Sequence, residues 1–387
     1  MSRRKIAVLG ATGSVGQSTL DLVAAAPEQF EVVALTAATN VDQLSADARR
    51  FQVKLAVIAD EALLPALRES LAGTNIHAAA GPAALAEAAT GEADWVMAAI
   101  VGCAGLEPVM AAIEAGKTVA LANKEALVTA GPLMTDAARR SRATILPVDS
   151  EHNAIFQCLA GQDVDAVARL ILTASGGPFR DWSAGAMARV TPEQAVAHPN
   201  WSMGAKISID SATMMNKGLE LIEAHYLFAV PAERINIVVH AQSIVHSLVE
   251  YADGSMLAQL GPSDMRVPIA HTLGWPDRMA TAVERLDLIA VGRLDFEKPD
   301  ESRFPALRLA REALASGGAA TVILNAANEV AVAAFLDRRI HFPDIAGTVE
   351  RALASMNEPV PQSIAEVVEL DRRARAVAIE LMPEQVA

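Results

Sequence analysis

Short apolar runs alternate with alanine-rich helical stretches from Lys5 to Asp149, and this alternation constrains the fold more than any other feature of the chain. The apolar runs lack polar alternation, as expected for strands that are covered on both faces. Strands that alternate with helices predict a parallel sheet wrapped by helices. We therefore expect a doubly wound, Rossmann-type α/β domain over residues 1–149. Its strands are expected at Ile6–Leu9, Glu31–Leu35, Leu55–Ile58, Trp95–Ile100, Thr118–Leu121 and Thr144–Val148.

The alternation of short apolar runs with helical stretches ends after Asp149. A helix is expected from Asn153 and a strand over Leu170–Thr173. The strand-like runs Ile235–Tyr251 and Ser255–Leu260 are joined through an Asp-Gly pair that favours a hairpin turn. These patterns predict a central α+β domain over 150–275, a linker over 276–305 and an α-helical C-terminal domain over 306–387, with breaks at Gly317–Gly318 and Pro343.

Composition excludes several classes of protein. The chain of 387 residues carries 46 acidic and 32 basic side chains, whereas a protein that binds nucleic acid needs a basic face. The longest apolar stretch, Trp95–Val101, is too short to span a membrane, and the N-terminus lacks the pattern of a signal peptide. Cys103 and Cys158 form no disulfide or zinc pattern, and both are expected to be buried in a protein of a reducing compartment. We therefore expect a cytoplasmic protein without a nucleic-acid or membrane partner.

A glycine-rich turn follows the first strand directly. Gly10-Ala11-Thr12-Gly13-Ser14-Val15-Gly16 leads into helix-favouring residues that continue to Ala26. Glycines allow the backbone to approach a pyrophosphate closely, and the following helix N-terminus offers free N–H groups and partial positive charge. Because the turn heads a series of strands and helices, it predicts a dinucleotide site rather than a plain tight turn.

The end of the second strand bears on which dinucleotide binds. Domains that bind NAD usually place Asp or Glu there for the ribose 2′-hydroxyl. This chain has Thr36-Ala37-Ala38-Thr39-Asn40, so the carboxylate that would repel a 2′-phosphate is missing. The pattern favours NADPH, although the same turn also lacks Arg and Lys.

Charged residues follow two strands that end at the same edge of the sheet, where doubly wound folds bind ligands. If Asp149-Ser150-Glu151 is extended, Asp149 and Glu151 point the same way into the crevice. Two carboxylates at 4 Å repel by about 4 kcal/mol at an effective dielectric constant of 20, which a hard cation or a proton relieves. Lys124, which follows the neighbouring strand, can instead form a salt bridge with one of them.

A second polar group lies between Ser211 and Glu220. If this stretch is helical, Asn216 and Glu220 share one face with Lys217 beside them. Ser211, Asn216 and Lys217 suit a substrate phosphate or hydroxyls, and Glu220 adds a third carboxylate. The alternative is a capped helix whose polar face is only solvated.

The segment Ser175–Gly204 is rich in glycine and can form a lid over a ligand. Ser175 and His198 would then donate or accept hydrogen bonds, and Trp201 would cover the ligand unless it belongs to the core. His246 and His271 lie in apolar surroundings and are expected to be structural.

These segments together resemble the 1-deoxy-D-xylulose 5-phosphate reductoisomerase family over almost the whole chain. The matching segments are Gly10–Gly16, Ala122–Glu125, Asp149–His152, Ser175–Arg180, His198–Gly204, Asp210–Glu220, Met265–His271 and Leu324–Glu329. The resemblance implies that 1-deoxy-D-xylulose 5-phosphate is rearranged by retro-aldol cleavage and re-addition, then reduced by NADPH to 2-C-methyl-D-erythritol 4-phosphate. This reaction belongs to isoprenoid precursor synthesis.

By position, the resemblance also assigns roles to residues. It implies that Asp149, Glu151 and Glu220 bind the divalent metal, Mg²⁺ or Mn²⁺. Lys124 and His198 are implied as further catalytic residues. Substrate contacts fall to Lys124, Ser150, Glu151, Ser175, His198, Trp201, Ser211, Asn216, Lys217 and Glu220. The NADPH site falls to Thr12, Gly13, Ser14, Val15, Ala38, Thr39, Asn40, Asn123, Glu125 and Gly204.

One position departs from the family. Its members commonly have Gly-Lys-Asn where this chain has Ala38-Thr39-Asn40, so a lysine near the adenosine phosphate is absent. The family is typically homodimeric through the second domain, and the strand-like region Ile235–Leu260 suits pairing of sheets between two copies.

Two other classes of function stay open at this point. A metal-free NAD(P)-dependent dehydrogenase of the semialdehyde or homoserine type would have a similar first domain, but it gives no role to the three carboxylates. A catalytically silent protein that senses a dinucleotide would use the charged groups as ion pairs.

Overall fold

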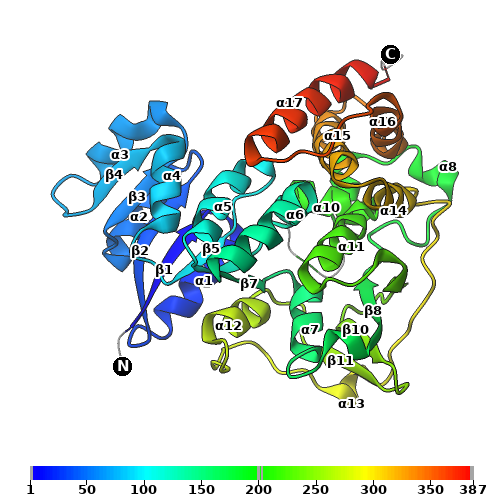
Figure 1. Ribbon diagram of the computed structural model, residues 1–387, viewed down its shortest axis with the longest axis horizontal. Helices are drawn as coiled ribbons and strands as arrows, with labels where there is room; N and C mark the ends of the chain where they lie inside the picture. The colour runs from blue at the N-terminus through cyan, green and yellow to red at the C-terminus, as the bar shows by residue number, and fades with distance from the viewer. Residues whose placement is uncertain (1–2, 198–200, 202–203, 384–387) are drawn as a thin grey trace. The chain divides into compact units, whose positions relative to one another are not determined.

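The computed structural model describes residues 3–197, 201 and 204–383, and Figure 1 labels their helices and strands. By contacts, the chain divides into two compact units. Unit 1 comprises residues 1–126, 134–153 and 265–283, and unit 2 comprises residues 127–133, 154–264 and 284–387. Each unit contains its own sheet.

Within the described residues, unit 1 is built on a parallel sheet of seven strands in the order β4-β3-β2-β1-β5-β6-β7. The strands are β1 (Arg4–Leu9), β2 (Phe30–Ala37), β3 (Leu55–Ile58), β4 (His77–Ala80), β5 (Trp95–Ala98), β6 (Thr118–Leu121) and β7 (Thr144–Pro147). The predicted doubly wound α/β fold and all its predicted strands are confirmed to within two residues at their ends. The strand order changes direction between β1 and β5, the kind of place where such sheets bind ligands.

Strand β4 is not predicted from the sequence. Its residues, His77-Ala78-Ala79-Ala80, favour a helix, but they pair with β3 from Leu55 opposite His77 to Ile58 opposite Ala80. The strand conformation of this edge segment therefore depends on its neighbour in the sheet rather than on local propensity.

Helices cover this sheet. They are α1 (Ser14–Ala24), α2 (Val41–Phe51), α3 (Leu64–Ser70), α4 (Gly81–Thr90), α5 (Leu106–Glu114), α6 (Lys124–Ser141) and α12 (Arg266–Gly274), with short 3₁₀ turns at Glu61–Leu63 and Cys103–Gly105. Helix α7 (Ser150–Cys158) follows β7. Right-handed crossovers place α1–α3 on one face and α4–α6 on the other. The core is apolar, with Ile6, Leu20, Leu35 and Trp95 almost wholly buried. Helix α6 is kinked at Ala130, and both α6 and α7 contribute residues to the two units.

Helix α12 belongs to unit 1 although it is far away in the sequence. The indole N–H of Trp95 donates to the carbonyl oxygen of Thr272 (3.1 Å), and Arg4 donates to the carbonyl oxygens of Leu273 (2.6 Å) and Trp275 (3.2 Å). The sequence-based division assigns 265–275 to the central domain and 276–283 to the linker. Side-chain contacts between distant segments group them with the first sheet instead.

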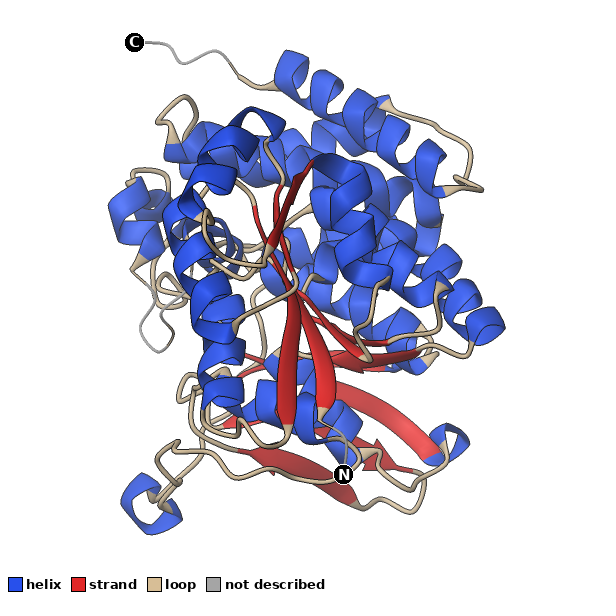
Figure 2. Cartoon of the chain, turned by 90° about the vertical axis from the view of Figure 1, so that its left-hand side faces the viewer, coloured by secondary structure: helices blue, strands red, loops and turns tan. Residues whose placement is uncertain are grey.

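Among the residues described in unit 2, four strands form a mixed sheet in the order β11-β10-β8-β9, and Figure 2 draws both sheets in red. The strands are β8 (Val167–Ala174), β9 (Ile235–Val239), β10 (Val245–Tyr251) and β11 (Met256–Leu260). The predicted hairpin is confirmed for β10 and β11, where Asp253 Oδ1 accepts from the Ser255 N–H (2.9 Å) and Gly254 has a φ of 86°. The expected single run Ile235–Tyr251 is wrong, because the chain turns at Ser243 (φ 52°) and forms two strands.

Helices complete unit 2. Those before the linker are α8 (Ala184–Met187), α9 (Pro192–Val196), α10 (Ala205–Ala212) and α11 (Met215–Phe228), with 3₁₀ turns at Val164–Ala166 and Ala232–Arg234; α13 (Leu288–Val291) lies in the expected linker. The C-terminal group, α14 (Ala306–Ser316), α15 (Gly318–Leu336), α16 (Phe342–Ser355) and α17 (Ile364–Leu381), gathers in one bundle coloured orange to red in Figure 1. The predicted helical character of the C-terminal region and its breaks are confirmed. By length and composition α15 could span a membrane, but 72% of its most apolar window is buried against the other helices, as in a core helix.

Candidate active site

The glycine turn of unit 1 is shaped by close backbone contacts at its two ends. Gly10 has a φ of 83°, and a Cβ there would lie 2.6 Å from the carbonyl oxygen of Ala99. A Cβ at Gly16 would lie 2.4 Å from the carbonyl oxygen of Gly10. Gly13 differs, because its φ of −81° suits any residue and an added Cβ would meet that oxygen at 3.5 Å. The outer glycines therefore fix the turn, while exposed Gly13 and Ser14 leave the N-terminus of α1 open to an anion.

The turn after β2 holds exposed polar groups beside this glycine turn. Thr36 is buried, and its hydroxyl accepts a hydrogen bond from the Gly10 N–H (3.0 Å), so its role is structural. Ala38, Thr39 and Asn40 are exposed, and Asn40 caps α2 by accepting from the Gln43 N–H (3.1 Å). This turn offers hydroxyl and amide groups, but no carboxylate, to a ligand.

Asn123 joins two loops at the same edge of the sheet. Its side-chain amide donates to the carbonyl oxygens of Ile100 (2.5 Å) and Gly102 (2.9 Å) and accepts from the Ala126 N–H (3.0 Å), which caps α6. Glu125, in the first turn of α6, is buried. The polar groups of the Asn123 side chain are therefore largely engaged in holding the loop after β5 against α6.

The carboxylates that follow β7 are close together, but not for the reason expected from the sequence. The predicted extended segment is wrong, because α7 begins at Ser150 and places Glu151 in its first turn. Carboxylate oxygens of Asp149 and Glu151 nevertheless lie within 4.8 Å of each other, and Ser150 Oγ donates to Glu151 Oε2 (2.6 Å). Two oxygen donors at this separation suit one hard cation.

The charge of Asp149 is balanced within unit 1. Lys124, at the start of α6, forms an ion pair with it, so the salt bridge considered from the sequence is present. His152 Nδ1 lies 3.8 Å from Asp149 Oδ1. Burial alone would raise the pKa of Asp149, but the Lys124 ammonium and then His152 hold that pKa well below its usual value. Asp149 is therefore a carboxylate at neutral pH.

In unit 2, the helices α10 and α11 meet at a sharp corner that carries the other predicted polar residues. Met214, between them, is buried with a φ of 63°, a left-handed conformation that costs a non-glycine residue about 1–2 kcal/mol. Thr213 Oγ1 donates to the carbonyl oxygens of Ile209 (3.1 Å) and Asp210 (3.2 Å). Ser211 lies on one arm of the corner, and Asn216 and Lys217 begin the other.

The predicted helical face is confirmed on α11, whereas the solvated alternative is wrong. Asn216 donates to Glu220 Oε1, and Lys217 pairs with Glu220 Oε2. Lys217 and Glu220 are buried, so these charges are not a solvated face. A buried carboxylate between an amide and an ammonium is a preorganised ligand for a cation or a polar substrate.

The loop after β8 packs directly onto this corner. Gly177 has a φ of 68°, and a Cβ there would lie 2.6 Å from the carbonyl oxygen of Ser211. Ser175 Oγ accepts from the Gly177 N–H (3.2 Å). Only glycine allows this approach, and it brings the segments of Ser175 and Ser211 together.

The remaining predicted residues have separate surroundings. Trp201 is half-buried, with its ring centroid 6.0 Å from that of His246. Gly204 is exposed and precedes α10, whereas His198 lies outside the described residues. His246 Nε2 contacts the carbonyl oxygen of Gly261 (3.1 Å), and His271 Nδ1 contacts the amide of Asn153 (3.1 Å). Both histidines contact polar groups of the protein itself, as expected of structural residues.

The two cysteines differ. Cys158 is buried as predicted, and burial raises its pKa to about 11. The expectation for Cys103 is wrong, because it is only half-buried in the loop after β5.

Each unit thus holds one polar group of the predicted site. Unit 1 brings together Lys124, Asp149, Ser150 and Glu151, and unit 2 brings together Ser175, Ser211, Asn216, Lys217 and Glu220. The sequence reasoning missed buried polar residues beside these groups, namely His152, Asp210, Glu223 and Asn328. Three of them lie within matched segments and Glu223 lies close to one, but no spacing rule marks them as buried.

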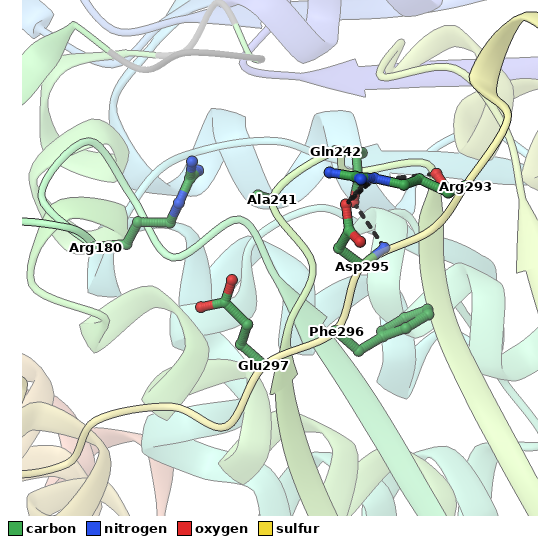
Figure 3. A pocket seen from close by; sticks show the side chains of 7 residues that line it. All are labelled: Arg180, Ala241, Gln242, Arg293, Asp295, Phe296 and Glu297. Carbon is green, nitrogen blue, oxygen red and sulfur yellow. Dashed lines mark hydrogen bonds and ion pairs between the residues drawn. The ribbon is translucent and has the colours of Figure 1, made fainter.

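Unit 2 also has an open pocket of about 660 Å³ that none of the predicted residues lines. Figure 3 shows Arg180 and Glu297 on two sides of it, with Arg293 and Gln242 bonded to Asp295. Side chains of both charge signs surround this pocket, so its charge selects no ligand class.

Comparisons with known proteins cover nearly the whole chain. Residues 6–131 match the model of the 1-deoxy-D-xylulose 5-phosphate reductoisomerase family, and residues 145–228 and 260–377 match models of C-terminal domains of the same enzyme. A reductoisomerase of that name from Zymomonas mobilis is 59% identical over 379 residues, which cover 98% of each chain. Another from Caulobacter vibrioides is 58% identical, over 99% of this chain and 98% of the relative.

Solved structures agree with these sequence relatives. The Zymomonas mobilis reductoisomerase in complex with NADPH has a TM-score of 0.94 at 57% identity and covers 98% of this chain and 99% of its own. A reductoisomerase in complex with NADPH, fosmidomycin and magnesium has a TM-score of 0.93 at 44% identity, over 97% of this chain and 98% of its own.

Proposed function

Because this chain belongs to the 1-deoxy-D-xylulose 5-phosphate reductoisomerase family, we propose that the polar groups described above divide the family's reaction among them. The chain is an NADPH-dependent enzyme that converts 1-deoxy-D-xylulose 5-phosphate to 2-C-methyl-D-erythritol 4-phosphate with a divalent metal. The observation that carries this function is 59% identity over 98% of the chain. A metal-free dehydrogenase is not favoured.

The NADPH site is proposed at the carboxyl edge of the first sheet. Gly13 and Ser14 would meet the pyrophosphate at the open N-terminus of α1, with Thr12 and Val15 beside them. The exposed turn Ala38-Thr39-Asn40 would contact the adenosine ribose and its phosphate through hydroxyl and amide groups. Asn123, Glu125 and Gly204 complete the proposed set. NADPH supplies the hydride, and the chain positions its nicotinamide.

Asp149, Glu151 and Glu220 are proposed as metal ligands. They offer carboxylate oxygens alone, which suit Mg²⁺ or Mn²⁺ rather than zinc. The metal, when bound, acts as a Lewis acid on substrate oxygens. Lys124 balances negative charge at this site, because its ammonium lies against Asp149. Ser150 orients Glu151 through their hydrogen bond.

The substrate is proposed to use both polar groups. Ser211, Asn216 and Lys217, at the corner of α10 and α11, would bind the phosphate together with Ser175, which the close approach of Gly177 brings to the same corner. Lys124, Ser150 and Glu151 would contact the oxygen-bearing carbon chain. His198 and Trp201 are proposed to cover the substrate as part of a lid over 175–204.

The domain roles follow from these positions. We assign NADPH binding to residues 1–149, catalysis and dimerisation to 150–275, a linking role to 276–305 and a supporting role to the helices of 306–387. The segment 265–283, which packs with the first sheet, would help to hold the cofactor domain.

The chain is also proposed to work as a cytoplasmic homodimer. Strand β11 lies at the edge of its sheet, where Met256 and Leu257 are each 46% exposed, and such an apolar edge favours pairing with another strand. Light scattering should give twice the chain mass, and Leu257→Lys should shift the protein towards the monomer. Ser255→Lys, at the exposed turn before β11, is the matched control and should leave the dimer intact.

The function is tested by incubating the enzyme with NADPH, Mn²⁺ and 1-deoxy-D-xylulose 5-phosphate while the nicotinamide absorbance is followed. The expected result is NADPH oxidation with one 2-C-methyl-D-erythritol 4-phosphate formed for each NADPH consumed. Turnover of an amino-acid semialdehyde without metal, and none of the sugar phosphate, would instead support the dehydrogenase.

A further inference from the structure

The corner between α10 and α11 needs support, because its backbone is strained and its residues are proposed to bind phosphate. Left-handed Met214 can persist only if the surrounding structure holds it. The hydroxyl of Thr213 stabilises the turn from inside, by donating to Ile209 and Asp210 and accepting from the Met215 N–H (3.3 Å). The position of the whole arm α10 must be set by contacts with other elements.

Asp210 supplies one such contact. It is only 1% exposed, and it directly precedes Ser211 on α10. Lys206, one helical turn earlier, pairs with Asp210 Oδ2 (2.9 Å), and the side-chain amide of Asn328 donates to Oδ1 (2.8 Å). Burying a carboxylate is costly unless it is paired and hydrogen-bonded, so losing one of these partners favours movement of Asp210 towards water.

Asn328 reaches Asp210 from the middle of α15, a helix that is otherwise almost entirely apolar. Asn325, one turn earlier, is equally buried but has another partner, since its amide donates to Glu329 Oε1 (3.1 Å) and Glu329 pairs with Arg375 of α17. Two asparagines on one helix therefore serve different neighbours: Asn328 contacts the helix that carries Ser211, and Asn325 faces the C-terminal helix.

We propose that Asn328 is a positioning residue for binding of the substrate's phosphate. It acts through Asp210, by fixing the arm of the corner on which Ser211 lies relative to Asn216 and Lys217. The inference rests on the proposed phosphate role of Ser211, Asn216 and Lys217. It gives a function to the matched segment Leu324–Glu329, which contains no residue of the predicted site.

The first experiment compares Asn328→Ala with Asn325→Ala in the full-length enzyme. Asn328→Ala should raise the KM for 1-deoxy-D-xylulose 5-phosphate and the inhibition constant of inorganic phosphate about tenfold, with kcat within threefold of wild type and unchanged NADPH affinity. Asn325→Ala should lower the melting temperature by about as much as Asn328→Ala does. It should leave both the KM for the sugar phosphate and the inhibition constant of inorganic phosphate unchanged. Equal changes in both variants, or no change in Asn328→Ala, would overturn the proposal.

The second experiment separates the hydrogen bond from the packing of Asn328. Asn328→Asp alone places two carboxylates together and should lose phosphate affinity. The double variant Asp210→Asn with Asn328→Asp again sets an amide opposite a carboxylate, so it should recover most of that affinity. If the alanine variant does not fold, Asn328→Ser replaces it, because serine keeps a small hydrogen-bond donor. Its KM for the sugar phosphate should lie between those of wild type and Asn328→Asp. Failure of the double variant to improve on Asn328→Asp would contradict the proposal.

Variants of the corner itself test the proposed phosphate site separately from the positioning role of Asn328. If Ser211→Ala and Asn216→Ala leave phosphate inhibition unchanged, the proposed phosphate site is wrong. If they weaken it at least tenfold whereas Asn328→Ala does not, the site stands and the positioning role of Asn328 is wrong.

Discussion

Replacing single glycines in the turn after β1 should separate folding from cofactor binding. In Gly16→Ala, the new Cβ would lie 2.4 Å from the carbonyl oxygen of Gly10, and ordinary contact requires that the backbone move by about 1 Å. In Gly13→Ala, the new Cβ would lie 3.5 Å from the same oxygen, and the φ of −81° already suits alanine. The two substitutions add the same methyl group three residues apart.

The structure gives different magnitudes for the two variants. Overpacking of this kind costs about 1–3 kcal/mol, offset at Gly16 by about 0.5–1 kcal/mol because alanine favours a helix. Each kcal/mol lowers the melting temperature of a unit of this size by about 2–4 °C. Gly16→Ala should therefore melt several degrees lower and bind NADPH at least tenfold more weakly. Gly13→Ala, which changes only an N-cap, should melt near wild type but bind NADPH more weakly, since its methyl group would stand against the pyrophosphate.

The assay combines thermal unfolding with a fluorescence titration of NADPH, without substrate. An unchanged melting temperature in Gly16→Ala would refute the close packing of the turn. NADPH affinity equal to wild type in Gly13→Ala would refute the placement of the pyrophosphate at this turn.

Three further predictions concern the cofactor, the proposed lid and pH. NADPH should be preferred to NADH, and Thr39→Lys should widen that preference by supplying a cation beside the 2′-phosphate; kcat/KM for both cofactors measures this, and a wild-type preference for NADH would contradict it. Trp201→Ala should reduce turnover of the sugar phosphate about tenfold or more with little change in NADPH affinity; equal losses in both would place Trp201 in the core. Burial, and then the charge of Arg278, lower the pKa of His271 to about 4. As the pH falls, His271 therefore gains its proton in the unfolded chain before it does so in the folded protein. The free energy of unfolding, measured in urea, should therefore depend on pH. The contribution of neutral His271, roughly 1–2 kcal/mol after solvent screening, should be fully present above pH 6.5 and should be lost as the pH falls towards 4. This loss should be smaller in His271→Gln, and an equal loss in that variant would exclude His271 as its source.

Local patterns predicted most of the fold because the sheet of unit 1 is buried and its strands are uniformly apolar. The exception, His77–Ala80, has a helical composition and takes its conformation from β3. The grouping of α12 with the first sheet depends on hydrogen bonds from Trp95 and Arg4 to a segment 177 or more residues away, and no local pattern encodes such contacts.

The candidate site shows the same division between local and distant information. The face shared by Asn216 and Glu220 follows from helical periodicity, and the structure confirms it. The proximity of Asp149 and Glu151 was expected from an extended segment, but Ser150 begins a helix, and a difference of one residue in a boundary changes which side chains share a face. The contact of Asn328 with Asp210 joins residues 118 positions apart, so it became visible only once α10 and α15 were packed.

The proposed metal ligands are central to the reaction, and one measurement tests them directly. It is the turnover of 1-deoxy-D-xylulose 5-phosphate by chelator-treated enzyme, before and after Mg²⁺ or Mn²⁺ is restored, for wild type and for Glu151→Gln. Wild-type turnover should vanish with the chelator and return with either ion. Glu151→Gln should stay slower by a thousandfold or more at saturating metal while NADPH binds normally, since loss of about 4 kcal/mol of Lewis-acid stabilisation corresponds to three factors of ten. Full turnover by the metal-stripped enzyme, or by Glu151→Gln, would contradict the account.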